Sequence, residues 1–174
     1  MPPHLYRGFT AAAHAEAFCR GEILLSTLHR CRNFESEAAR SHPNEAWPTF
    51  LAANPMEIPE AYLLTFTNEL LVAKEEFGGF VVEVTEPKVF MEEIALALER
   101  RGFECQAHFG YVTYATQEHL VTNTPAVEIA FTKPEIFHWE QEFRMIWEPI
   151  ESTVPLQRRL LKCSSAGHLC KLLR

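Results

Sequence analysis

Apolar and polar residues alternate along this chain mostly in short runs, which are typical of strands. The first run, Leu5 to Phe9, is followed by an alanine-rich segment, Ala11 to Arg20. We expect a strand and then a helix, with Thr10 as the helix cap and Gly21 as the stop. The next run, Glu22 to Thr27, is apolar and ends in hydroxyl side chains, which predicts a second strand.

The remainder of the chain predicts more strands than helices. Further strands are expected at Ala61 to Thr67, Gly79 to Val84, Glu104 to Ala115, Ala126 to Phe131 and Trp139 to Trp147. Helices are expected around Asn33 to Arg40 and from Val89 to Arg101, where Gly102 ends the pattern. Prolines at 43, 48, 55 and 59 exclude a regular helix between them. About six strands without regular βαβ alternation predict an α+β fold, with mixed, mainly antiparallel sheets and a few flanking helices.

The last predicted strand has the most regular alternation of charge and apolarity. Its core-facing residues would be Phe143, Met145 and Trp147. Glu140, Glu142 and Arg144 would share the opposite face, where successive side chains lie about 7 Å apart. Arg144 would then offset part of the repulsion between the two carboxylates. An exposed face with self-neutralising charges is the structural alternative.

Composition favours a soluble intracellular protein. The 174 residues are 47% hydrophobic and 22% charged, and no apolar run reaches the roughly 20 residues that span a bilayer. The N-terminus has no signal-peptide pattern, and the five cysteines are scattered without a C-x-x-C pair. We therefore expect a cytoplasmic protein with no metal site and no membrane contact. The net charge of -7 argues against an extended basic surface for nucleic acid, although it leaves a nucleic-acid substrate open.

The C-terminal tail differs from the rest of the chain. Residues 156–174 contain five basic residues and no acidic residue. We expect a main domain over residues 1–155 and a basic amphipathic helix over 156–174 that packs on it. A contact with nucleic acid or a protein partner is the alternative for this tail.

Three short pieces, far apart in sequence, resemble the ADP-ribosyltransferase superfamily. They are Tyr6-Arg7, Leu25-Ser26-Thr27 and Glu140-Gln141-Glu142. Members of the arginine-specific branch carry an arginine on the first strand, Ser-Thr-Ser on the second and Glu/Gln-x-Glu on a later strand. By this resemblance Arg7, with Tyr6 beside it, would bind the NAD phosphates. Ser26 and Thr27 match the first two hydroxyl positions, and Leu28 stands in place of the third.

A closer resemblance covers more of the chain. It is to a family of uncharacterised bacterial domains, thought to share the transferase-like fold, that end in Lys-Pro...Trp...Glu-x-Glu-aromatic-Arg. The matching pieces, in order, are Leu5 to Arg7, Leu64 to Thr67, Phe77 to Val84, Val112 to Tyr114 and Lys133 to Arg144. The central tryptophan-histidine-tyrosine cluster of many members is replaced here by Leu70 to Lys74.

The resemblance implies an enzyme that cleaves the nicotinamide bond of NAD, without a metal. Glu142 would stabilise the positive charge that develops on the ribose, and Glu140 would orient the nucleophile. Tyr111 or Tyr114 would stack on the nicotinamide ring. The expected activity is mono-ADP-ribosyl transfer or NAD hydrolysis, in a toxin, defence or counter-defence protein. The acceptor, whether protein, nucleic acid or water, stays open, and a non-catalytic nucleotide- or protein-binding module is the alternative.

Each candidate residue also has a structural interpretation. Arg7 would pair with Glu142 across adjacent strands. Ser26 and Thr27 would only end a strand, and the two tyrosines would pack in the core or on the sheet surface. His138 is expected to be a surface histidine rather than a proton shuttle.

Overall fold

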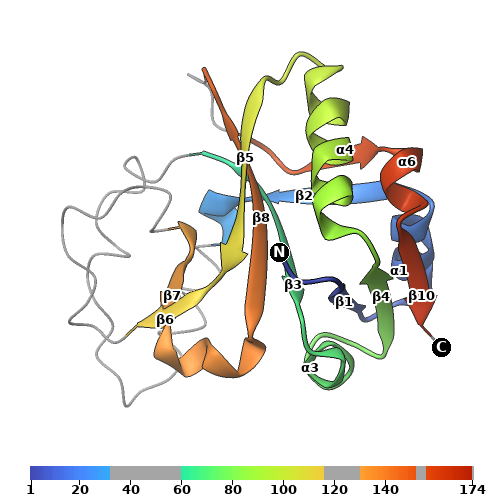
Figure 1. The fold of residues 1–174 in the computed structure, drawn as a ribbon, viewed down its shortest axis with the longest axis vertical. Coiled ribbons are helices and arrows are strands. Elements are labelled where there is room, and N and C mark those ends of the chain that lie inside the picture. Colours follow the sequence, from blue (N-terminus) through green and yellow to red (C-terminus); the bar gives the residue numbers. More distant parts are fainter. Residues whose placement is uncertain (32–59, 116–129, 152–155, 174) are drawn as a thin grey trace.

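The computed structural model describes residues 1–31, 60–115, 130–151 and 156–173 (Figure 1). The main sheet contains β1 (Leu5–Phe9), β2 (Glu22–Thr27), β3 (Tyr62–Thr67), β4 (Phe80–Val84), β5 (Cys105–Tyr111), β8 (Glu142–Pro149), β9 (Arg159–Lys162) and β10 (Cys170–Leu173). A separate parallel pair is formed by β6 (Thr113–Ala115) and β7 (Thr132–Pro134). The helices are α1 (Ala12–Cys19), α3 (Leu70–Glu75), α4 (Pro87–Glu99), α6 (Ser164–Gly167) and the 3-10 helix η4 (Glu135–Glu140).

The sheet forks at β3. One edge of β3 pairs along its whole length with β8, from Tyr62 opposite Trp147 to Thr67 opposite Glu142. The other edge is divided: its start pairs with β2 through Leu63 and its end pairs with β1 only at Thr67. One arm of the fork continues from β1 to β4 and β10, and the other from β2 to β9. All these pairs are antiparallel, so the predicted α+β fold with a mainly antiparallel sheet is confirmed.

The core lies between one face of this sheet and helices α1 and α4. The alternation predicted for the last strand holds here, because Phe143, Met145 and Trp147 are all buried in the core cluster. The Trp147 indole N–H donates to the carbonyl of Met91 on α4 at 3.2 Å, which satisfies its one polar atom. A smaller cluster on the opposite face contains Leu63 and Ile146.

Several local expectations need correction. The N-cap of α1 is Ala11 rather than Thr10, and Ala11 makes no side-chain cap bond. The strand predicted from Glu104 to Ala115 is divided into β5 and β6, which belong to different sheets. Of the strand predicted from Ala126 to Phe131, residues 126–129 lie outside the described residues. The last two, Ala130 and Phe131, are not in a strand. The helix predicted around residues 33–40 and the loop with the four prolines also lie outside the described residues.

The predicted C-terminal helix is wrong. Residues 156–173 instead form β9, the short helix α6 and β10. β9 completes one arm of the fork by pairing with β2, and β10 completes the other by pairing with β4. Short apolar runs fit helix and strand patterns equally well, and here the two open sheet edges decide in favour of strands. In the described parts of the chain, no helix has the length and apolarity that crossing a bilayer requires.

Candidate functional site

A buried carboxylate at the start of β8 is the centre of the candidate site. Glu142 is 4% exposed and forms a two-pronged ion pair with Arg144, which is 0% exposed. Nε of Arg144 donates to Oε1 of Glu142 at 2.7 Å, and Nη2 donates to Oε2 at 3.2 Å. Nη1 of the same guanidinium donates to the carbonyl of Ala130 at 2.7 Å. The partner role predicted for Arg144 is therefore confirmed, whereas the exposed-face alternative is wrong because both side chains are buried.

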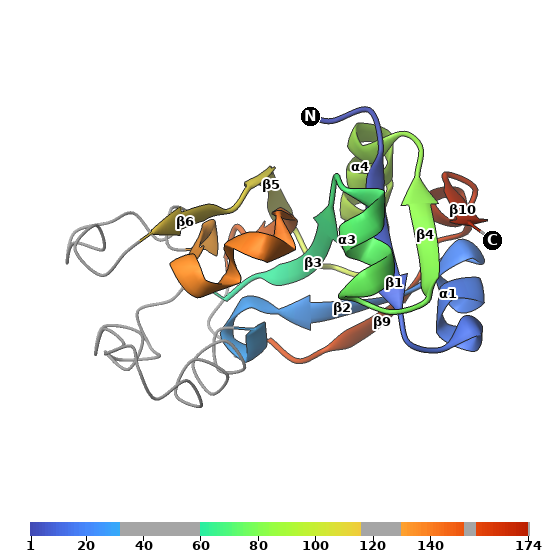
Figure 2. The same ribbon diagram turned by 90° about the horizontal axis from the view of Figure 1, so that it is seen from below.

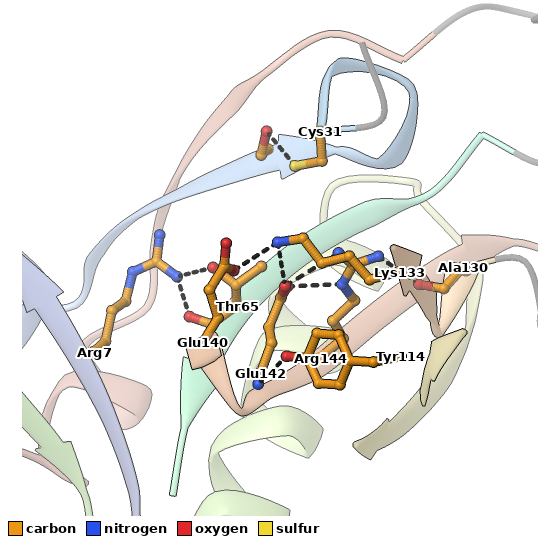
Figure 3. A network of polar contacts seen from close by, with 10 residues as sticks. Arg7, Cys31, Thr65, Tyr114, Ala130, Lys133, Glu140, Glu142 and Arg144 are labelled. Atoms are coloured by element: carbon orange, nitrogen blue, oxygen red, sulfur yellow. Dashed lines mark hydrogen bonds and ion pairs between the residues drawn. The ribbon is translucent and has the colours of Figure 1, made fainter. Parts of the chain in front are cut away.

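Lys133, on β7, joins the two glutamates (Figure 3). Its ammonium nitrogen lies 3.0 Å from Oε2 of Glu142 and 2.6 Å from Oε2 of Glu140. It also lies 4.7 Å from the centre of the Phe137 ring, a cation–π contact. Sequence analysis placed Lys133 in the Lys-Pro motif but predicted no role for its side chain. A buried carboxylate needs a cationic partner, so a partner for Glu142 could have been predicted. The sequence does not show which basic residue that partner is.

Glu140 reaches the site by a different route from the one predicted. It is the last residue of η4 and not a strand residue, so the prediction that it shares a strand face with Glu142 is wrong. Gln141 follows in the left-handed region, with φ of 44°, and turns the chain into β8. This turn leaves the Glu140 side chain, 12% exposed, beside Lys133. The two carboxylates are therefore brought together by a shared cation rather than by strand spacing.

The cations keep Glu142 ionised. Burial alone would raise the pKa of this carboxyl, but the charges and hydrogen bonds of Arg144 and Lys133 outweigh burial and lower the pKa to about 2. Two carboxylates and two basic side chains thus lie within ion-pair distance of one another in a compact cluster, which we call the charge quartet: Lys133, Glu140, Glu142 and Arg144.

Arg7 lies at the fork of the sheet. Its Nη1 donates to both the carbonyl and the hydroxyl of Thr65, the hydroxyl at 3.3 Å, at a point where none of the described strands pairs with that edge of β3. Its guanidinium lies within 6.0 Å of the ring centres of Phe9, Phe18 and Phe66. Burial lowers the pKa of Arg7, while electrostatic interactions with Cys31 and Glu142 act in the opposite direction.

The structure does not support the alternative of an Arg7–Glu142 pair across adjacent strands. β3 separates β1 from β8, and among the described residues Arg7 makes no ion pair with Glu142. Arg7 nevertheless approaches the charge quartet from the other side of Thr65 (Figure 3). The glycine that follows Arg7 is explained by packing, because a Cβ at Gly8 would lie 2.5 Å from the Ala73 carbonyl oxygen on α3.

The two hydroxyl residues of β2 have separate surroundings. Ser26 accepts a hydrogen bond from the Cys31 thiol at 3.5 Å, and it pairs with Leu63, two residues before Thr65 on β3. Thr27 is buried, and its hydroxyl accepts a hydrogen bond from the backbone N–H of Arg30 at 3.3 Å. Thr27 therefore caps the turn that follows β2, as its structural interpretation expected.

The three candidate tyrosines take different positions. The Tyr114 hydroxyl accepts a hydrogen bond from the backbone N–H of Glu142 at 2.8 Å, and burial raises its pKa to about 12. Tyr111 is exposed and packs edge-on against Phe143, which places it on the sheet face opposite Glu142. Tyr6 on β1 pairs with Thr67 on β3, and Thr67 pairs with Glu142 on β8. Tyr6 and Glu142 therefore share a face of the sheet but are separated by β3. The structure thus brings Tyr114, and not Tyr111, to the charge quartet.

No family model, curated protein or solved structure matches this chain significantly. In the described ranges, no group of three or more histidine, cysteine, aspartate or glutamate side chains could hold a metal ion. His138 is exposed, and its ring Nδ1 lies 3.0 Å from the carbonyl of Glu135. The chemically active groups of the site are therefore those of the charge quartet, Arg7 and Tyr114.

Proposed function

We propose that this protein has an ADP-ribosyltransferase-like fold and cleaves the nicotinamide–ribose bond of NAD, by transferring ADP-ribose or by hydrolysis. One observation carries the proposal: Arg7 lies at Thr65 in the fork of the sheet, close to Glu140 and Glu142, which are far from Arg7 in sequence and meet at Lys133 (Figure 3). These are the residues that the resemblance assigns to the phosphates, the nucleophile and the ribose.

The charges of these groups fit the proposed roles. Glu142 is ionised at neutral pH, as a group that stabilises positive charge on the ribose must be. Glu140 is less buried and ends a 3-10 helix, so its carboxylate is the one better placed to meet a nucleophile. Within the described residues only Nη1 of Arg7 is hydrogen bonded, which leaves Nε–H and Nη2 as donors for a diphosphate.

The test is nicotinamide release from NAD by the purified protein, with and without cell lysate. Release without lysate indicates hydrolysis, and release only with lysate indicates transfer to an acceptor. Glu142→Gln should reduce release about a hundredfold or more, as expected for loss of one preorganised charge. The assay needs a temperature at which the variant is still folded, because Glu142 also holds Arg144 and Lys133. Release at the wild-type rate by folded Glu142→Gln would refute the assignment.

A second candidate, a non-catalytic nucleotide-binding module, is favoured by one specific observation. Both oxygens of Glu142 already accept hydrogen bonds from cations of the chain itself. A carboxylate so neutralised contributes less to stabilising a charge on a ligand. Calorimetry separates the candidates: NAD binding without any nicotinamide release, with or without lysate, would favour the binding module.

A further inference from the structure

Lys133 occupies the space between the two carboxylates to which the proposed function assigns chemistry. Its ammonium group contacts Glu140 at 2.6 Å and Glu142 at 3.0 Å, and the side chain is only 6% exposed. With the Phe137 ring at 4.7 Å, the ammonium is enclosed by two anions and an aromatic face. A positively charged ligand group that approaches these carboxylates therefore meets a cation already in place.

The two cations of the charge quartet are anchored differently. Arg144 belongs to β8, which pairs with β3 on one side and β5 on the other, and its guanidinium also holds the Ala130 carbonyl. Lys133 belongs to the short β6–β7 pair outside the main sheet, at the opposite end of the molecule from α1 and β10 (Figures 1 and 2). Lysine also has a flexible four-carbon stem, whereas the arginine fork is rigid. Of the two, Lys133 is the cation that can leave.

We propose that Lys133 is an internal counter-ion that NAD⁺ displaces from Glu140 and Glu142 on binding, so that Lys133 determines which redox form of the dinucleotide the site accepts. This inference rests on the proposed function. The nicotinamide ring of NAD⁺ carries a positive charge, so the exchange replaces one cation with another and leaves the carboxylates neutralised. The ring of NADH is uncharged, and displacing Lys133 with it would leave two buried carboxylates with Arg144 as their one remaining cation in the charge quartet.

The first experiment compares dissociation constants for NAD⁺ and NADH by calorimetry in wild type and in Lys133→Met, which keeps the length of the chain and removes the charge. The variant should bind NAD⁺ about tenfold or more tightly than wild type, as expected if Lys133 closes the site at least about nine-tenths of the time. Its affinity for NADH should change much less. Lys88→Met is the matched control, because Lys88 is 73% exposed and its removal changes the net charge equally.

The second experiment uses the wild-type protein and so does not depend on the folding of a variant. Reductive methylation of lysines, followed by peptide mass spectrometry, should modify Lys133 several-fold faster with saturating NAD⁺ than without it, and NADH should not have this effect. If NAD⁺ binds but leaves the modification of Lys133 unchanged or slower, the displacement is refuted while the proposed function stands. If neither wild type nor folded Lys133→Met binds NAD⁺, the proposed function fails and the displacement fails with it.

Discussion

Arg144 and Glu142 form an ion pair inside a single buried strand, two residues apart, with Nε and Oε1 separated by 2.7 Å. The same chain contains an exposed counterpart, in which Nε of Arg20 lies 3.2 Å from Oε1 of Glu22, also two residues away. The two pairs share residue types and spacing, but the buried pair is two-pronged and has Lys133 and the Ala130 carbonyl as further partners. The exposed pair therefore serves as a reference for the stability that the buried cluster contributes.

We predict that Arg144→Met costs about 3–5 kcal/mol of unfolding free energy, because it leaves a buried carboxylate short of a partner and the Ala130 carbonyl without its donor. Arg20→Met should cost less than about 1 kcal/mol. Urea denaturation of both variants and the wild type gives the comparison. Equal losses in the two variants would show that the buried pair has no special structural role.

The low pKa of Glu142 predicts loss of stability in acid. Its folded-state pKa of about 2 lies below the ordinary value of 4.5, so the folded state favours the ionised form. The contribution is fully present above about pH 4.5 and is lost as the pH falls toward about 2, because the unfolded chain takes up the proton first. At about 1.4 kcal/mol per pKa unit, the group accounts for about 3 kcal/mol. Denaturation of wild type and Glu142→Gln between pH 6 and pH 2 should show a smaller pH dependence in the variant.

Much of the sheet could be predicted from local pattern. Alternation located the strands β1, β2, β3 and β4 to within about two residues, an accuracy usual for sequence-based boundaries. Glycines follow both predicted helices in the left-handed conformation, with φ of 82° at Gly21 and 76° at Gly102, although α4 runs from Pro87 to Glu99 rather than from Val89 to Arg101. The buried set of Phe143, Met145 and Trp147 followed from the two-residue period of the last strand.

The site was harder to predict because it depends on tertiary arrangement. Glu140 appeared to continue the strand, since nothing in the sequence signals that Gln141, a residue with a side chain, adopts a left-handed conformation. The contact of Lys133 with Glu142 depends on where the β6–β7 pair lies beside the main sheet. The position of Arg7 at the fork depends on β3 being shared by two strands, which no local pattern encodes.

Arg7 provides a test that separates ligand binding from structure. If its remaining N–H donors bind the diphosphate of NAD, Arg7→Lys should weaken NAD binding about tenfold or more, because lysine keeps the charge but loses the planar fork. Arg7→Ala should weaken binding further and also lower the melting temperature, because the Thr65 carbonyl at the fork loses its donor. Paired thermal melts and NAD titrations of the three proteins measure both effects. NAD affinity that is unchanged in both variants would assign Arg7 to the fork of the sheet alone.

Glu140 is predicted to act on the acceptor rather than on the bond that breaks. It contacts Lys133 but lies outside β8, whereas Glu142 is fixed by Arg144, Lys133 and the Tyr114 hydroxyl. Removing the Glu140 charge should therefore leave the position of Glu142 in place. Glu140→Gln should reduce transfer to an acceptor in lysate about tenfold more than it reduces hydrolysis by water, because general-base assistance contributes factors of about 10² to 10⁴.

Both rates are measured on one preparation by nicotinamide release and by labelling of the acceptor with radioactive ADP-ribose. If the two rates fall by the same factor, Glu140 acts together with Glu142, through their shared contact with Lys133, and has no separate role toward the acceptor.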